Sequence, residues 1–399
     1  MRNVFFYYLC KQNCYSMKRL LTLFAIIAMG GMFCTVSAAK KLTPAQALIQ
    51  RLAKIQKKGY MYGHQDDVFY GVSWNWEFGR SDTYDLVGDY PGVMGFDMGG
   101  LEVGDSKNLD SVPFTRIREA VQQHYERGGI ITLSWHPRNP YLGTTAWIGS
   151  DTTAYDNAVK ALLAVNRKDL VAQLDDPRLT VRNILPNGKT HKKFMLWLSR
   201  LTDFITSLKD SKGNQIPVIF RPYHENTGSW FWWGKDLCTV QEYKQLWSMT
   251  QDYINAQQNL GDYIVWSYSP SWYKEEAMDR YPGDDRVELL GTDVYQWGPQ
   301  SEFVNNLDRE LAFLTQMGKE RNKIIAVTEC GYQNSPDPTW WSKVFKPIAD
   351  KYTFAYFLPW RNWHAEHFGA APGIATADDF KQMAKEKNVL FLKDIKKIK

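Results

Sequence analysis

Pro217-Val218-Ile219-Phe220 is a short apolar run, and the polar segment Arg221-Pro222-Tyr223-His224-Glu225-Asn226 follows it directly. A run of this kind, bounded by a polar turn, is typical of a strand that is buried on both faces. The same pattern recurs along the chain. The full set of eight predicted strands is Gly59–Tyr62, Gly92–Phe96, Ile130–Trp135, Pro217–Phe220, Tyr263–Tyr268, Val287–Gly291, Lys323–Val327 and Thr353–Leu358.

Segments with apolar residues at helical spacing separate most of these strands. They are Phe114–Tyr125, Phe194–Leu208, Tyr243–Ala256, Phe303–Met317 and Trp340–Ala349. Strands that alternate with helices indicate parallel βαβ units, and eight such units close into a barrel. We therefore expect an α/β fold, a single (β/α)8 TIM barrel over residues 39–399 with long loops on the active-site face. The longest connection runs from Pro137 to about Thr190 and contains a helical run, Ala154–Val165.

The first 38 residues have the character of a secretory leader. Lys18 and Arg19 precede the apolar run Leu20–Met29, and Val36-Ser37-Ala38 supplies the small residues of a cleavage site. We predict a signal peptide over residues 1–38, with Met17 as the alternative true start.

From this leader we expect secretion across the inner membrane, to the periplasm or to the cell exterior. Cys34 raises the alternative of a surface lipoprotein, but Gly31-Met32-Phe33 lacks the usual small residue next to the cysteine, so that alternative is less favoured. The apolar run Leu20–Met29 is too short to span a bilayer permanently, so we expect no membrane span.

Composition excludes several classes of function. The chain has 48 basic and 43 acidic residues, and removing residues 1–38 leaves 44 basic against 43 acidic, a balance of about +1. No basic face is left for nucleic acid, so we expect no nucleic-acid partner, and we expect a monomer. Aromatic residues make up 15% of the chain and include 16 Trp, a surplus that suits stacking on the apolar faces of sugar rings.

Cys238 and Cys330 are the two cysteines that follow the leader. Two cysteines argue against a disulfide framework and against a thiolate metal site, although they leave a single bridge open. We predict no metal and no cofactor.

Polar and aromatic residues end nearly every predicted strand, where a structural barrel would have small turn residues. Parallel strands of a barrel end on one face, so these residues should surround one site. They include His64-Gln65-Asp66, Asp97, Trp135-His136-Pro137, Arg221 to Asn226, Asp293-Val294-Tyr295, Thr328-Glu329 and Trp360-Arg361-Asn362.

Glu225 and Glu329 follow the fourth and seventh strands, which lie on opposite sides of a narrow barrel. Both carboxylates can therefore point into one cleft. Hydrolysis of a glycosidic bond with retention needs such a pair, an acid that protonates the leaving oxygen and a carboxylate roughly 5–5.5 Å away that attacks the anomeric carbon. Either glutamate alone could instead be a loop carboxylate in a salt bridge.

The segment Arg221 to Trp233 resembles the acid/base signature of glycoside hydrolase family 26, the β-mannanases. Val327-Thr328-Glu329-Cys330-Gly331 resembles the nucleophile strand of that family, and Trp135 to Pro140 resembles its His-x-x-Asn-Pro segment. Cys330 and the short stretch Pro137–Trp147 are less typical of the family, which weakens the transfer of Trp147 as a sugar contact.

The resemblance implies a secreted bacterial retaining hydrolase that cleaves β-1,4-mannosidic linkages in mannans, galactomannans or glucomannans. It implies that Glu225 is the acid/base and Glu329 the nucleophile. It also implies that four side chains border the subsite where the bond breaks: His136, His224, Trp230 and Tyr295. Action on another β-glycan, either mixed-linkage glucan or β-1,3-xylan, stays open within the family, and so does internal cleavage against release of short products.

The residues themselves suggest matching roles. Tyr295 can donate a hydrogen bond to Glu329 and hold it ionised, although it could be only a packed rim tyrosine. Trp230 and Trp360 can form the floors of sugar subsites. Arg361 at the rim can bind hydroxyls of a distal sugar or form a salt bridge.

Other side chains near the strand ends have structural readings as well. His224 can donate to a sugar hydroxyl or be a satisfied core histidine. We expect Asp97 and Asp293 to anchor loops or Arg221.

Two other classes of protein compete with this interpretation. A metal-dependent barrel hydrolase would also place histidines at strand ends, here His64, His136 and His224, but it usually needs a denser set of ligands. A non-catalytic glycan-binding barrel would use the aromatic residues alone and leaves the two aligned glutamates unexplained.

Overall fold

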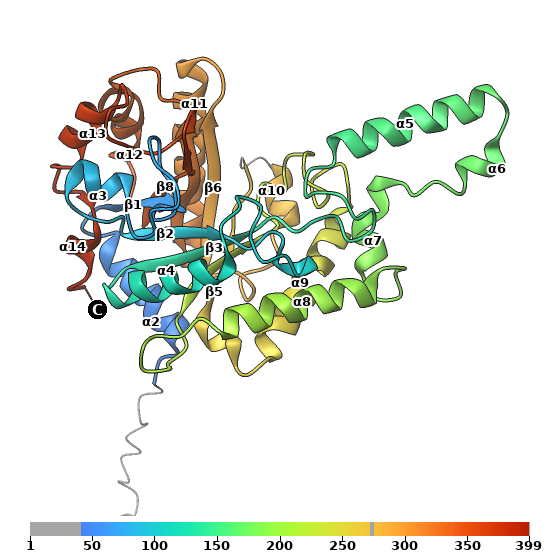
Figure 1. The fold of residues 1–399 in the computed structure, drawn as a ribbon, viewed down its shortest axis with the longest axis horizontal. Helices are drawn as coiled ribbons and strands as arrows, with labels where there is room; N and C mark the ends of the chain where they lie inside the picture. Colours follow the sequence, from blue (N-terminus) through green and yellow to red (C-terminus); the bar gives the residue numbers. More distant parts are fainter. Residues whose placement is uncertain (1–40, 272–274, 399) are drawn as a thin grey trace, which may run out of the picture. The chain divides into compact units, whose positions relative to one another are not determined.

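The computed structural model describes residues 41–271 and 275–398. Its parallel strands follow one another in chain order round a closed sheet, and the eighth strand pairs with the first. They are β1 (Tyr60–Gln65), β2 (Val93–Asp97), β3 (Ile130–Trp135), β4 (Val218–Pro222), β5 (Ile264–Tyr268), β6 (Leu289–Gln296), β7 (Ile324–Tyr332) and β8 (Tyr356–Pro359). The predicted (β/α)8 barrel is therefore confirmed (Figure 1).

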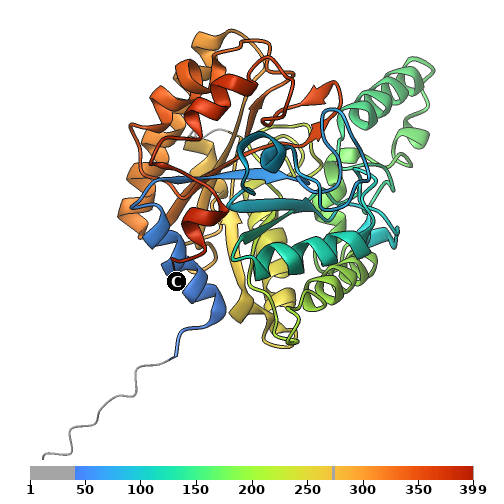
Figure 2. The same ribbon diagram turned by 60° about the vertical axis from the view of Figure 1, so that its left-hand side comes forward.

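Helices follow the strands as the alternation predicts (Figures 1 and 2). The longer ones are α4 (Phe114–Glu126), α5 (Gly149–Ala164), α8 (His191–Thr206), α9 (Val240–Ala256) and α11 (Gln300–Arg321). The shorter ones are α3 (Asp82–Val87), α6 (Lys168–Val171), α7 (Thr180–Ile184), α10 (Glu275–Arg280), α12 (Lys346–Ala349), α13 (Ala377–Met383) and α14 (Leu392–Ile395). The apolar faces of α4, α8, α9 and α11 and the outer faces of the strands contribute to the larger of two hydrophobic clusters.

A helix that the sequence analysis did not predict closes the amino-terminal end of the barrel. Helix α2 (Pro44–Ile55) begins with a capping box, in which Thr43 and Gln46 satisfy each other's backbone N–H groups. Its buried residues Leu48 and Leu52 pack with side chains from inside the barrel, such as Val93. Helix α2 therefore seals one end and leaves the opposite end, where the strands finish, for the site.

Strands β6 and β7 are longer than predicted. The predictions ended at Gly291 and Val327, whereas the strands continue to Gln296 and Tyr332. The added residues are partly polar, and several of them line the cleft, so an apolar pattern did not include them. The segment Trp340–Ala349 is helical as predicted, with a π-helical part, Trp340–Phe345, that leads directly into α12.

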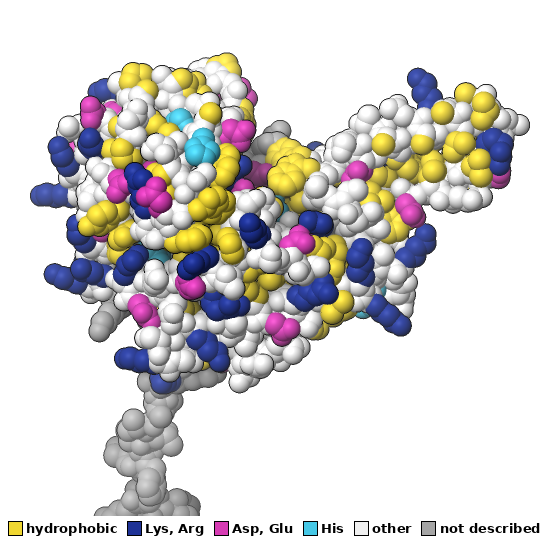
Figure 3. Space-filling model, in the orientation of Figure 1, with side chains coloured by type: hydrophobic (Ala, Val, Ile, Leu, Met, Phe, Trp, Pro, Cys, Tyr) yellow, Lys and Arg dark blue, Asp and Glu magenta, His cyan; other side chains and the backbone are white. Residues whose placement is uncertain are grey.

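The long connection after β3 contains helix α5, which extends away from the barrel in Figure 1. None of its residues is buried. Hydrophobic side chains cover much of its surface in Figure 3, and Leu163 and the following Val165 are 47% and 66% exposed. The segment that leads into α5 passes the open end of the barrel at Trp147.

A two-stranded hairpin follows β8. It consists of β9 (Asn362–Trp363) and β10 (Glu366–His367), and a short strand, β11 (Val389–Leu390), pairs with β1. Residues Thr43–Lys399 form one compact unit. No helix among residues 41–271 and 275–398 has the length and apolar character needed to cross a membrane. The predicted signal peptide lies outside the described residues.

Candidate active site

A cleft of about 1050 Å³ lies at the carboxyl ends of the strands. The structure brings most of the predicted site residues together in its lining: His136, Glu225, Trp230, Tyr295, Glu329, Trp360 and Arg361. His224, predicted to contact the sugar, lies beneath this lining instead and is 1% exposed. Its link to the cleft is His136, which lines the cleft and contacts His224.

Glu225 stands on a strained turn after β4. Tyr223 and Glu225 have φ angles of 50° and 53°, in the left-handed region that residues other than glycine rarely adopt. The backbone N–H of Glu225 donates to the Ser269 carbonyl at 2.8 Å, which holds the turn against β5. Strain of this kind persists where surrounding contacts fix a functional side chain.

The carboxyl of Glu225 accepts one hydrogen bond, from Nε1 of Trp230 to Oε2 at 2.7 Å. Its pKa is raised well above the usual value, first because the surrounding protein displaces water, and second because Glu329 and Asp293 carry negative charge nearby. Glu225 is therefore suited to hold a proton near neutral pH.

Glu329 has the opposite environment. Tyr295 donates its hydroxyl proton to Oε2 at 2.7 Å, and Arg221 pairs with Oε1. The same Arg221 also binds Asp293, through Nη1 at 2.9 Å. Both oxygens of Glu329 thus contact donors, and the hydrogen bond expected from Tyr295 is present. Asp293 anchors Arg221, as one of the sequence interpretations had it.

A β-bulge in β7 sets the direction of Glu329. Thr292 of β6 is opposite Val327, but the next residue, Asp293, is opposite Glu329, so β7 carries one extra residue, Thr328. The pairing of β7 with β8 shifts over the same stretch. Thr328 donates to Oδ1 of Asp293 at 2.7 Å, which fixes the extra residue. Bulges redirect side chains next to active sites, and no pattern in the sequence signals this one.

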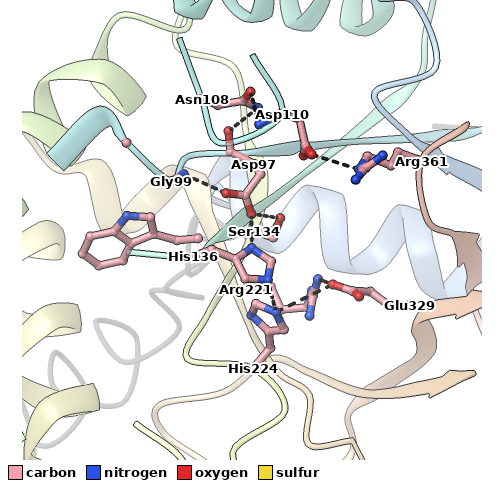
Figure 4. A network of polar contacts seen from close by, with 12 residues as sticks. Asp97, Gly99, Asn108, Asp110, Ser134, His136, Arg221, His224, Glu329 and Arg361 are labelled. Carbon is pink, nitrogen blue, oxygen red and sulfur yellow. Dashed lines mark hydrogen bonds and ion pairs between the residues drawn. The ribbon is translucent and has the colours of Figure 1, made fainter. Parts of the chain in front are cut away.

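A chain of polar contacts supports the floor of the cleft (Figure 4). Nδ1 of His136 lies 2.6 Å from Oδ2 of Asp97, and Nε2 of His136 lies 3.0 Å from Nε2 of His224. Asp97 also accepts from the Ser134 hydroxyl at 2.6 Å and from the Gly99 N–H at 2.7 Å. Asp97 therefore anchors the loop after β2, as one sequence interpretation proposed, and it anchors His136 rather than Arg221.

The two histidines have opposite protonation tendencies. Burial acts to lower the pKa of His136, but the Asp97 carboxylate outweighs it and the pKa is raised. The pKa of His224 is lowered well below its usual value by burial and by the positive charges of Arg221 and His136. These two directions favour the arrangement in which Nε2 of His136 donates and Nε2 of His224 accepts.

Aromatic rings form the walls of the cleft. Trp230 and Trp360 line it as predicted, and Trp360 contacts the His136 ring edge-to-face at 5.9 Å. Trp147, whose transfer as a sugar contact was weakened in the sequence analysis, lies in the lining as well. Its ring is 47% exposed and stacks on His136 with 5.4 Å between centroids. The neighbouring Trp232 and Trp233 are fully buried core residues.

Arg361 lies in the lining of the cleft and forms the salt bridge that one of its sequence interpretations proposed, while its binding to sugar hydroxyls stays a prediction. Its Nε lies 2.9 Å from Oδ1 of Asp110. Burial raises the pKa of Asp110 to about 6, although the charge of Arg361 opposes this. Asp110 also lines the cleft and was missed, because a single aspartate in a loop carries no sequence signal.

The remaining predicted residues lie away from the reacting centre. Nδ1 of His64 pairs with Asp67 at 2.7 Å, so His64 does not join His136 and His224. In the part of the chain that is described, no group of three or more His, Cys, Asp or Glu side chains could hold a metal ion. Cys238 and Cys330 are both buried and free, so the bridge that the sequence left open is absent.

The fold and the site define a class, a (β/α)8 barrel with paired glutamates at the ends of its fourth and seventh strands. Comparison with known proteins places the chain within that class. The model of glycosyl hydrolase family 26 matches residues 37–185 and 180–371. The chain belongs to glycosyl hydrolase family 26.

Solved structures and curated proteins agree with this placement. A GH26 β-mannanase from Bacteroides ovatus, BoMan26A, is 40% identical, with a TM-score of 0.79 over 90% of this chain and 98% of that one. GH26C from Muricauda sp. MAR_2010_75 is 26% identical, with a TM-score of 0.74 over 89% and 94%. A mannan endo-1,4-β-mannosidase of Bifidobacterium adolescentis is 27% identical over 92% of this chain. The chain spans 36% of the length of that relative and 46% of one from Bacillus subtilis.

Proposed function

We propose that this protein is a retaining glycoside hydrolase that cuts β-1,4-mannosidic linkages in mannans. The observation that carries the proposal is the contrast between the two glutamates. Glu329 contacts an arginine and accepts from a tyrosine hydroxyl, while burial and nearby negative charge raise the pKa of Glu225. One carboxylate prepared to attack and one prepared to donate a proton are what a double displacement needs.

In the first step an oxygen of Glu329 bonds to the anomeric carbon, and the bond from that carbon to the glycosidic oxygen breaks. The proton of Glu225 goes to the departing oxygen. The negative charge of Glu329 is lost in the ester, so the pKa of Glu225 falls and its carboxylate can act as a base.

In the second step Glu225 takes a proton from water, the water oxygen bonds to the anomeric carbon, and the bond to Glu329 breaks. Each displacement inverts the configuration at the anomeric carbon, so the two together retain it.

The surrounding side chains have supporting roles in this proposal. Trp230, Trp360 and Trp147 offer apolar faces for sugar rings, and Trp230 also orients the proton of Glu225 through its indole N–H. His136 lines the cleft while His224 supports it from beneath. Arg361 and Asp110 offer charged groups to the hydroxyls of a more distant sugar.

A product profile tests the substrate. The purified enzyme is incubated with mannan, glucomannan, xylan and mixed-linkage glucan. We expect cleavage of mannan and glucomannan, and cleavage of only xylan or mixed-linkage glucan would reject the mannan assignment. Binding without cleavage of any of the four would favour a non-catalytic glycan-binding barrel. Proton NMR of the first product should give the β-anomer, and an initial α-anomer would reject the double displacement.

Residues 1–38 direct secretion in this proposal, to the periplasm or beyond. Sequencing of the amino terminus of protein recovered from those fractions checks it. A mature chain that begins at Ala39 is expected, and an intact leader in the cytoplasm would contradict it.

A further inference from the structure

Exposed aromatic rings gather beside the cleft, on the loop that follows β1 and on the β9–β10 hairpin. We call Trp76, Phe78 and Trp363 the aromatic platform. Trp76 and Phe78 are 36% and 43% exposed, and Trp363 is partly exposed. The ring centroid of Trp76 lies 6.2 Å from that of Trp363 and 6.4 Å from that of Phe78. Figure 2 shows the loop and the hairpin side by side.

The backbone at the platform is strained at two residues. Trp76 and His364 have φ angles of 59° and 46°, in the left-handed region that bulky side chains avoid. The Trp76 N–H donates to the Phe69 carbonyl at 2.7 Å, and Nδ2 of Asn75 lies 3.4 Å from Nε2 of His364. These contacts hold a tryptophan at the surface in a conformation that costs free energy, and strain of this kind clusters at ligand sites.

The platform adjoins the cleft through the β9–β10 hairpin. Trp363 is opposite Glu366 in the hairpin, and Glu366 lines the cleft together with Trp360 and Arg361. Beneath the platform, the Tyr70 ring contacts Trp363 edge-to-face at 5.0 Å. A bound polysaccharide that extends beyond Arg361 would therefore contact the platform.

We propose that the aromatic platform is a distal sugar-binding site for the same β-mannan chain whose scissile bond lies between Glu225 and Glu329. This inference rests on the proposed function. Apolar faces of sugar rings stack on exposed indoles, and the neighbouring Asn75, His364 and Glu366 offer polar groups for the hydroxyls. The site would raise affinity for long chains and leave short substrates unaffected.

The test compares two variants of the platform with a control. Trp76→Gly removes the ring and suits the backbone, because glycine adopts a positive φ freely, so the variant should keep its melting temperature. Trp363→Ala removes the second ring. Tyr84→Ala is the matched control, since Tyr84 is 46% exposed on α3 and packs against Tyr90.

Each variant is assayed on an aryl β-mannobioside and on mannan polymer. Binding of mannohexaose is measured by calorimetry in each variant combined with Glu329→Gln. Both platform variants should bind mannohexaose about fivefold more weakly or worse and show a matching rise in KM for the polymer. Turnover of the mannobioside should not change, and the control should match the wild type on both substrates.

Unchanged affinity for mannohexaose in both platform variants would overturn the inference. An equal loss on the short and the long substrate would also overturn it, because the rings would then only shape the cleft. A wild-type enzyme that fails to cleave both the mannobioside and mannan would instead reject the proposed function. The calorimetry with mannohexaose would then show separately whether the platform binds sugar.

Discussion

The imidazoles of His136 and His224 meet nitrogen to nitrogen, with 3.0 Å between their Nε2 atoms. Such a contact requires one ring to donate and the other to accept. Asp97 favours His136 as the donor, because its carboxylate on Nδ1 raises the pKa of His136, while the pKa of the buried His224 is lowered. The shifts therefore favour a positive charge at His136, on the floor of the cleft.

Asp97→Asn should lower the pKa of His136 and destabilise the fold. The folded pKa of His136 is raised, so its protonation contributes stability that is complete below about pH 6.5 and is lost as the pH rises through the folded value. Loss of one partner of a buried pair costs about 3 kcal/mol or more. Urea unfolding should therefore give a larger difference from the wild type at pH 6 than at pH 9. An equal difference at both pH values would contradict this assignment.

Glu225→Ala and Glu329→Ala should each abolish most turnover on mannan, by several orders of magnitude for the nucleophile. Folding should survive, because both side chains line the cleft. Steady-state kinetics and thermal melts check this. Glu320→Ala, an exposed site on α11 hydrogen-bonded to Gln316, is the control and should behave as the wild type. A Glu225 or Glu329 variant that keeps more than about a tenth of the activity would remove that residue from the mechanism.

Trp230→Phe should move the alkaline limb of the pH profile upward. The indole N–H bonds to the Glu225 carboxylate and lowers its pKa, in opposition to burial. Without that donor the pKa of Glu225 should rise further, and kcat/KM should stay high to a pH roughly half a unit higher or more. An alkaline limb that does not move would show that Trp230 does not act on the acid, and a limb that moves to lower pH would contradict the direction of its effect.

Trp230→Ala should raise KM and lower kcat together. The ring is then missing from both the bound substrate and the transition state, and a stacked sugar contributes on the order of 1 kcal/mol. Kinetics on mannan equal to those of the wild type would reduce Trp230 to a surface aromatic residue.

Wild-type activity should follow a bell-shaped pH profile with an optimum in the mildly acidic to neutral range, because Glu329 must be ionised and Glu225 protonated. On an aryl glycoside whose leaving group needs no proton, Glu225→Ala should lose the alkaline limb. Azide should then accelerate turnover by replacing the base-activated water. An unchanged alkaline limb without azide rescue would assign the acid/base to another residue.

Much of this fold could be predicted from the sequence because apolar runs and helical spacing report burial directly. The eight runs correspond to the eight barrel strands, and Glu225 and Glu329 do lie in one cleft. The predictions failed where polar residues belong to strands, as at Asp293 and Glu329, whose side chains face the site rather than the core.

Other features depend on contacts between segments that are distant in the chain. The bulge at Thr328 follows from pairing with two neighbouring strands, and the role of Asp110 follows from Arg361, which is far from it in the sequence. The stacking of Trp147 on His136 likewise depends on where a long loop returns. Local patterns carry no information of this kind.

The central claim is that Glu329 forms a covalent bond to the sugar and that Glu225 then activates the water. Glu225→Ala incubated with 2,4-dinitrophenyl β-mannobioside tests it, because the first step needs no acid while the second lacks its base. Mass spectrometry of the intact protein and of its peptides should show a mannobiosyl adduct on the peptide that contains Glu329. An adduct on another residue, or steady turnover with no adduct, would contradict the account.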